Sequence, residues 1–108
     1  MAIKIKVVEI FSEIPGARFK TDGPHSGELF RERHLRPAFE KLKESEKLLI
    51  DFDGAYGFPT SFLEEAFGGL ARQFGIEAVL KKLEFKCDEE PNLIEEVIGY
   101  ITNVSPND

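Results

Sequence analysis

The sequence predicts a single α/β domain over residues 1–108, with a mixed sheet of about four strands packed by helices. Two observations predict this fold. Apolar segments typical of strands alternate along the chain with segments whose apolar residues recur at helical spacing. Hydrophobic residues make up 42% of the chain and charged residues 31%, which indicates a folded domain with its own core rather than a disordered chain.

The N-terminal segment predicts two strands. Residues 3–10 begin by alternating apolar and charged side chains, a pattern typical of a half-buried strand. Pro15-Gly16 then indicates a turn. We expect residues 17–20 to form a short second strand that pairs back on the first, so that the predicted order is β-β-α-β-α-β-α.

A helix interrupted by proline is predicted next. Ser26 is a good N-cap for a helix that starts near Gly27. Pro37 cannot occupy a helix interior without a kink. We therefore expect a break near Arg36, with Pro37 at the first position of a second helical piece.

The rest of the chain is organised around residues 47–74, which predict a strand, a loop and a helix. Residues 47–52 are nearly continuously hydrophobic, as in a strand buried on both faces of a sheet. An Asp-Gly turn follows at 53–54, and Thr60 or Ser61 is expected to cap the helix. Apolar residues then recur at helical spacing up to residue 74.

Gly68-Gly69 lies inside this predicted helix, where each glycine costs about 0.5–1 kcal/mol relative to alanine. We expect close approach to the sheet or to a partner backbone to offset this cost. Gly75 is expected to end the helix. Residues 79–85 then predict a strand, and Pro91 is well placed in the first turn of a last helix.

Charge and cysteine content narrow the functional classes. The net charge is −6, with +2 in residues 1–50 and −8 in residues 51–108, which argues against broad binding to a nucleic-acid backbone. Cys87 is the one cysteine, so an internal disulfide is excluded. No signal peptide or membrane span is apparent, and we expect a cytoplasmic location with no membrane partner.

Thr60 and Ser61 are the first candidate functional residues. A phosphoryl group at a helix N-terminus meets free N–H groups and the positive end of the helix dipole. The two hydroxyls therefore predict either a phosphorylation switch or simply a helix cap.

Asp51 and Asp53 end the central strand, where ligands of α/β proteins gather. Two carboxylates there could hold Mg²⁺, or Asp53-Gly54 could be only a turn, which we favour. We see no partner lysine for a phosphoacceptor aspartate. An enzyme using Asp51, Asp53 and Ser61 ranks last, because no set of nucleophile, base and orienting group is visible.

Arg31, Arg33 and Arg36 form a basic stretch that could bind an anion or nucleic acid. Glutamates are interleaved with them, which is more typical of a solvated helix face. The spacing of His25 and His34 does not indicate a metal site, and no cofactor is predicted.

Three motifs carry a resemblance to a known family. They are GPHSGELFRE at residues 23–32, DFDG at residues 51–54 and SFLEEAFGGL at residues 61–70. In these motifs the chain resembles the bacterial STAS-like domains of unknown function, which are related to the STAS domains of anti-sigma-factor antagonists. The resemblance implies a STAS-like fold over the whole chain.

The related STAS antagonists imply a function as well. In those domains a hydroxyl that follows an aspartate is phosphorylated by a histidine-kinase-like ATPase, and that hydroxyl matches Thr60 here. Pro59 replaces the aspartate, and Phe62 replaces a glycine of the motif. The resemblance implies a non-catalytic module for partner switching, with Asp53, Gly54, Thr60 and Ser61 at its docking face. The alternative is anion or nucleic-acid binding through the Arg31 stretch.

Overall fold

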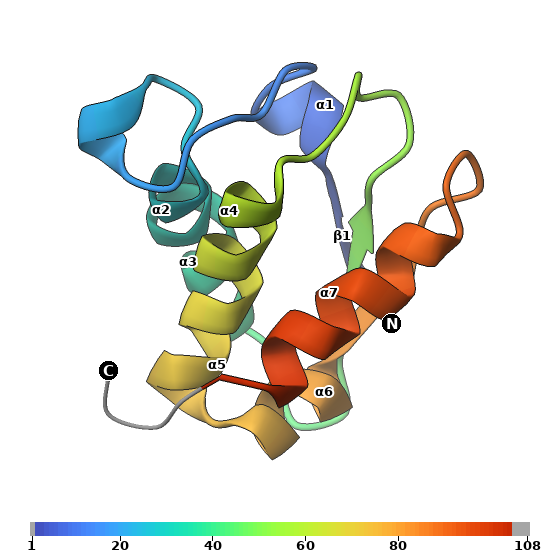
Figure 1. Ribbon diagram of the computed structural model, residues 1–108. Helices are drawn as coiled ribbons and strands as arrows, with labels where there is room; N and C mark the ends of the chain where they lie inside the picture. Colours follow the sequence, from blue (N-terminus) through green and yellow to red (C-terminus); the bar gives the residue numbers. More distant parts are fainter. Residues whose placement is uncertain (1, 105–108) are drawn as a thin grey trace.

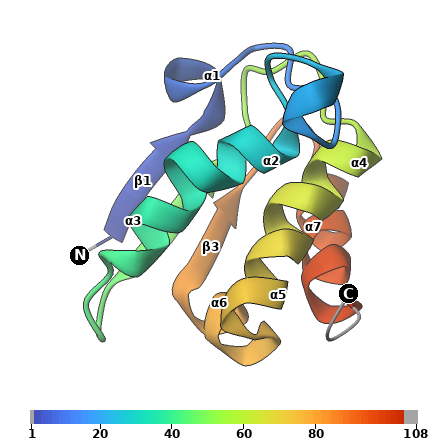
Figure 2. The ribbon, with the colours of Figure 1, turned by 90° about the vertical axis from the view of Figure 1, so that its left-hand side faces the viewer.

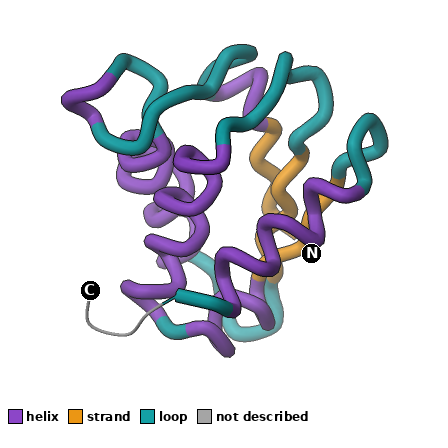
Figure 3. Tube along the Cα trace, in the orientation of Figure 1, coloured by secondary structure: helices purple, strands orange, loops and turns teal. Residues whose placement is uncertain are grey.

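The computed structural model describes residues 2–104 and contains a three-stranded parallel sheet (Figure 1). The strands are β1 (Ala2–Lys6), β2 (Lys47–Asp51) and β3 (Leu83–Lys86), in the order β1-β2-β3. The α/β class is confirmed, but the prediction of about four strands in a mixed sheet is wrong for this part of the chain. The parallel strands end at the same edge, and the loops that follow β1 and β2 lie together there, at the top of Figure 3.

Helices form the second layer. The first long helix, helix 27–40, consists of α2 (Gly27–Phe30), the π-helical turn η2 (Arg31–Leu35) and α3 (Arg36–Glu40). The second, helix 60–74, consists of α4 (Thr60–Leu63), the π-helical turn η3 (Glu64–Gly68) and α5 (Gly69–Phe74). The remaining helical elements are α1 (Val7–Ile10), the 3₁₀ turn η1 (Lys20–Asp22), α6 (Ile76–Lys82) and α7 (Asn92–Thr102).

Both long helices lie on the same side of the sheet, in front of it in Figure 2. The side chains of Ile5, Leu48 and Ile50 are buried under them. On the opposite face Lys4 and Glu84 are exposed and Leu49 is only half-buried. The prediction that β2 is buried on both faces is therefore wrong, because no helix in residues 2–104 covers that second face.

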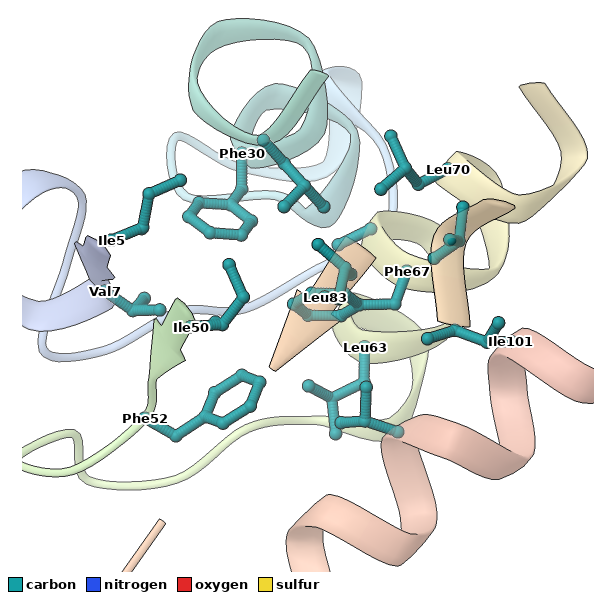
Figure 4. Close-up of a cluster of buried hydrophobic side chains, with 14 of the residues drawn as sticks. Ile5, Val7, Phe30, Ile50, Phe52, Leu63, Phe67, Leu70, Leu83 and Ile101 are labelled. Atoms are coloured by element: carbon teal, nitrogen blue, oxygen red, sulfur yellow. The ribbon is translucent and has the colours of Figure 1, made fainter. Parts of the chain in front are cut away.

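The core forms where this face of the sheet meets the helices (Figure 4). Phe30 and Phe67 come from the two long helices, Leu83 from β3 and Ile101 from α7. Each is at most 6% exposed. Full burial of one such side chain contributes roughly 1.5–3 kcal/mol, so these contacts hold the two layers together.

The predicted second strand at residues 17–20 is absent because its carbonyl groups bind elsewhere. The carbonyl of Ala17 accepts from the N–H of Gly27 at 3.1 Å, and that of Arg18 accepts from the N–H of Glu28 at 3.0 Å. The segment thus satisfies the free donors at the start of helix 27–40. The predicted cap is confirmed there, since the Ser26 hydroxyl accepts from the N–H of Leu29 at 3.0 Å.

The predicted break at Arg36 is also wrong, since helix 27–40 runs through Pro37. The N–H of Arg36 donates to the carbonyl of Arg31, five residues earlier, which is the π-helical pattern. The wider turn ends just before Pro37, whose ring would clash with a carbonyl in a regular α-helical turn. A π-helical turn therefore takes the place of the expected kink.

Two strand boundaries differ from the prediction, and one predicted helix end is confirmed. Residues 7–10 leave the first strand and form α1. Gly75 ends helix 60–74 as predicted, with a φ of 97°. The predicted strand at 79–85 begins only at Leu83, because residues 76–82 form α6 instead. Ile76, Val79 and Leu83 recur at near-helical spacing, and Val79 is fully buried.

We expect Gly27→Ala to destabilise the protein by about 1–3 kcal/mol, because overpacking a core position costs that much. A Cβ atom at Gly27 would overlap the backbone carbonyl oxygen of Phe62. Gly99→Ala is the matched control, because nothing lies within 4 Å of a Cβ atom there. Urea unfolding of both variants checks the prediction, and equal stability of the two would contradict it.

Candidate functional site

The candidate site lies at the carboxyl edge of the sheet, where the loop between β2 and helix 60–74 is exposed. Tyr56 is 83% exposed at the tip of this loop, and Gly54 at its start has a φ of 96°. The N–H of Tyr56 donates to the carbonyl of Glu13 at 2.9 Å, and the N–H of Gly54 donates to Glu89 Oε1 at 2.7 Å. The loop is thus fixed to its neighbours on both sides while its side chains reach solvent.

Thr60 and Ser61 begin the helix, but neither caps it. Pro59 occupies the N-cap position in an extended conformation, and no side chain accepts from the first helical N–H groups. The predicted cap is wrong because the helix starts one residue earlier than a Thr60 cap would require. Thr60 is exposed and Ser61 half-buried.

The Thr60 hydroxyl contacts α7. It lies beside the hydroxyl of Tyr100, which donates to Glu96 Oε2 at 2.7 Å. Burial, and next the bond to Glu96, raise the pKa of Tyr100, while the nearby Thr60 hydroxyl opposes them. Thr60 therefore belongs to a small polar group that joins two helices.

Asp53 joins the loops that follow β2 and β3. Its carboxylate accepts from the N–H of Asp88 at 3.1 Å, from the N–H of Glu89 at 3.0 Å and from Lys86 Nζ at 2.7 Å. The N–H of Glu89 and the Lys86 ammonium hold the pKa of Asp53 well below its usual range, and Asp53 in turn raises the pKa of Lys86. We call this set of bonds the Asp53 clamp.

Asp51 is only 2% exposed and accepts from the N–H of Asp53 at 3.0 Å. Lys6 Nζ lies 3.5 Å from its carboxylate. The expectation that no lysine accompanies the two aspartates is wrong, because the parallel register places Lys6 and Lys86 on either side of Asp51. Lys6 and Lys86 end the observed strands β1 and β3, whereas the predicted strands covered residues 3–10 and 79–85. Correct strand boundaries and register would therefore have revealed both lysines.

Metal binding at these aspartates finds no support in residues 2–104. No group of three or more histidine, cysteine, aspartate or glutamate side chains there could hold a metal ion. Protein donors already occupy both oxygens of Asp53. His25 and His34 instead pack edge-on against Phe11, each with ring centroids 5.7 Å apart.

The arginine stretch does not form one basic surface. Arg31 is 8% exposed, and its Nη1 donates to the Glu65 carbonyl at 2.6 Å and to Glu65 Oε2 at 2.8 Å. Arg36 pairs with Glu32 and Glu40 on the surface, and Arg33 is exposed. Arg31 is therefore inaccessible to an external anion in this structure.

The buried side chain of Arg31 explains why a glycine occupies position 69. A Cβ atom at Gly69 would overlap Nη1 of Arg31. At Gly68 a Cβ atom would lie 2.7 Å from Glu64 Oε2 and 3.2 Å from Val104. The two glycines thus leave room for the side chains of Arg31, Glu64 and Val104. The expectation that they allow close approach to the sheet or to a partner backbone is wrong.

A pocket of about 400 Å³ opens beside the exposed loop. Phe52, Phe58 and Leu93 form its apolar part, and Cys87 contributes a buried thiol. Burial raises the pKa of the Cys87 thiol, which makes it a weak nucleophile at neutral pH. Sequence reasoning did not predict this pocket, because its walls come from segments brought together by the Asp53 clamp.

These features define a small α/β domain with an exposed loop and helix start at the carboxyl edge of a parallel sheet. A family model described as a STAS-like domain of unknown function matches residues 26–93. The match covers more than half of the chain, so the protein belongs to that family, as the resemblance predicted. No match was found among curated proteins or among solved structures.

Between residues 2 and 104, none of the helices combines the length and apolar character that a membrane span requires.

We expect Arg31→Leu to destabilise the protein by about 1–3 kcal/mol, because it removes the short buried bonds to the carbonyl and carboxylate of Glu65. Glu65 keeps only its longer ion pairs, with Arg18 at 3.5 Å and Arg72 at 3.8 Å. Arg36→Leu, which removes only surface pairs, is expected to change stability by about 1 kcal/mol or less. Denaturant unfolding checks both values. A loss at Arg31 as small as at Arg36 would contradict the assigned role of the buried pair.

We expect Asp53→Asn to reduce the stability of the protein at neutral pH. The difference in stability from wild type should become smaller as the pH is lowered. Because the folded-state pKa of Asp53 is lowered, its carboxylate stabilises the fold above the unfolded pKa of about 4. That contribution is lost as the pH falls from about 4 toward the folded pKa. Urea midpoints measured between pH 7 and pH 2 should therefore converge for variant and wild type.

The charge-matched control is Asp22→Asn, which alters an exposed aspartate outside the clamp. Its difference from wild type is expected to stay small at every pH. A difference at Asp53 that did not vary with pH would show that the clamp does not depend on the carboxylate charge.

Proposed function

We propose that this protein is a non-catalytic regulatory module of the cytoplasm that binds a protein partner. The docking face comprises the loop from Gly54 to Pro59 and the first turn of helix 60–74. The exposure of Tyr56 and Thr60 at this face is the observation that carries the proposal. Membership of a STAS-like family supports a regulatory role.

Control of docking by phosphorylation is the second part of the proposal. Thr60 or Ser61 is the phosphorylated residue, and the exposure of Thr60 favours Thr60. The first N–H groups of helix 60–74 carry no side-chain cap, so a phosphoryl group would not displace one. Phosphorylation would add up to about two negative charges to the docking face without unfolding the helix.

The partner is proposed by analogy with STAS antagonists to be a histidine-kinase-like ATPase. Pro59 stands where those domains carry an acidic residue, so the partner must recognise a loop without that carboxylate. Tyr56 offers it an exposed aromatic side chain instead, a residue type enriched in protein interfaces.

The bonds of the two aspartates support the non-catalytic part of the proposal. Asp51 is buried beside Lys6, and Asp53 is engaged by two N–H groups and Lys86. A carboxylate that acts as a general base must reach the proton it removes. Neither carboxylate is positioned to do so while the Asp53 clamp is closed.

We expect the double variant Thr60→Asp/Ser61→Asp to weaken partner binding while leaving the Tm nearly unchanged. The bait would be the 108-residue protein in a pull-down from the native host's lysate, followed by mass spectrometry and titration of any retained ATPase. Thr21→Asp/Ser45→Asp adds the same charge at exposed positions away from the docking face and should bind as wild type does. Equal affinity of the two double variants would contradict the switch.

A further inference from the structure

The pocket beside the docking loop lies between two segments distant in sequence. One wall comes from residues 55–58, and the other from residues 89–96, which include the start of α7. Its volume of about 400 Å³ falls within the range of about 300–1,000 Å³ that is typical of small-ligand sites. The pocket is therefore large enough for a small organic group.

Aromatic rings form the interior of the pocket. Phe52 is 2% exposed and meets Phe58 edge-on, with ring centroids 5.1 Å apart and an interplanar angle of 80°. Phe58 packs in turn against Phe62, with centroids 6.0 Å apart. Because Phe58 is held on both sides, its ring is fixed before any ligand enters.

The polar part of the lining is acidic. Three glutamates contribute to it, and none of the lining residues is a lysine, arginine or histidine. They are Glu89, Glu90 and Glu96. Lys86, close by in sequence, is engaged by Asp53 and Asp88 at 2.7 and 2.9 Å.

Among the described residues 2–104, no cation is paired with these three carboxylates. Glu89 accepts from the N–H of Gly54, and Glu96 accepts from the hydroxyl of Tyr100, and both of these donors are neutral. Within residues 2–104, no hydrogen-bond or ion-pair partner is found for the Glu90 carboxylate. The positive end of α7 carries only about half an elementary charge, so the three glutamates dominate the potential.

We propose that this pocket binds an organic cation, namely an ammonium or guanidinium group on a short apolar chain. The apolar chain would contact Phe52 and Phe58, where an aromatic face also attracts a cation, and the charged end would lie among the glutamates. A bare metal ion fits less well, because no cluster of metal-binding side chains exists in the described residues. This inference concerns the isolated protein and goes beyond the proposed docking function.

The test is an NMR titration of the ¹⁵N-labelled 108-residue protein. The free cationic probes are n-butylguanidinium and n-butylammonium, and n-butylurea is the neutral isostere. A capped Gly-Arg-Gly peptide presents the same guanidinium as a protein side chain. We expect saturable shifts confined to residues 52–58 and 87–96 with the cations and none with the urea, and weaker binding as salt is raised.

Charge variants test whether the pocket glutamates are responsible. Glu90→Gln/Glu96→Gln should weaken cation binding about fivefold or more, since it removes two carboxylates next to the ligand. Glu77→Gln/Glu95→Gln changes the net charge equally at exposed positions outside the pocket lining and should stay within about twofold of wild type. Unchanged amide shifts elsewhere would establish that both variants fold.

The titration distinguishes a free organic cation from a basic side chain of a protein. Tighter binding of the free probes would indicate a small metabolite, and tighter binding of the peptide would indicate a basic side chain of a protein. Absence of saturable shifts with every cation, equal binding of the urea, or equal binding by the two charge variants would overturn the proposal. None of these results depends on the phosphorylation switch, which is tested separately with the partner.

Discussion

The close approach of helix 27–40 to helix 60–74 is the contact on which the remaining packing depends. Gly27 lies against the backbone of Phe62, and Gly69 leaves room for the side chain of Arg31. Arg31 then reaches the backbone carbonyl of Glu65 within η3, as well as its carboxylate. Because Arg31 begins one π-helical turn and Glu65 lies in the other, the two helices are joined where each departs from regular α-helical geometry.

The Asp53 clamp holds two loops together at the edge of the sheet, as the helix contact holds two helices together in the core. By accepting from the N–H groups of Asp88 and Glu89, Asp53 draws the loop after β3 toward the loop after β2. Glu89 completes the link by accepting from the N–H of Gly54. The exposed docking loop and the acidic wall of the pocket are thus held together by bonds that do not use the exposed side chains.

Local signals in the sequence predicted the α/β class, the Ser26 cap, the glycine that ends helix 60–74 and a strand at 47–52, which is observed at 47–51. Each of these features depends on a few adjacent residues. The errors arose where bonds between residues that are not adjacent in the sequence decide the structure. Residues 17–20 bond to a helix start instead of a strand, and a π-helical turn accommodates Pro37. Thr60 and Ser61 were located by motif, but the Asp53 clamp and the pocket needed the register of the sheet.

The docking face and the pocket meet at α7. The hydroxyl of Tyr100 lies beside Thr60 and donates to Glu96, and Glu96 lines the pocket. A negative charge added at Thr60 would lie within one Debye length, about 8–10 Å, of that carboxylate if the present contacts persisted. It would make the potential of the pocket more negative, and so favour a cation there. Phosphorylation and cation binding would then reinforce each other through Coulomb attraction, without any change of fold.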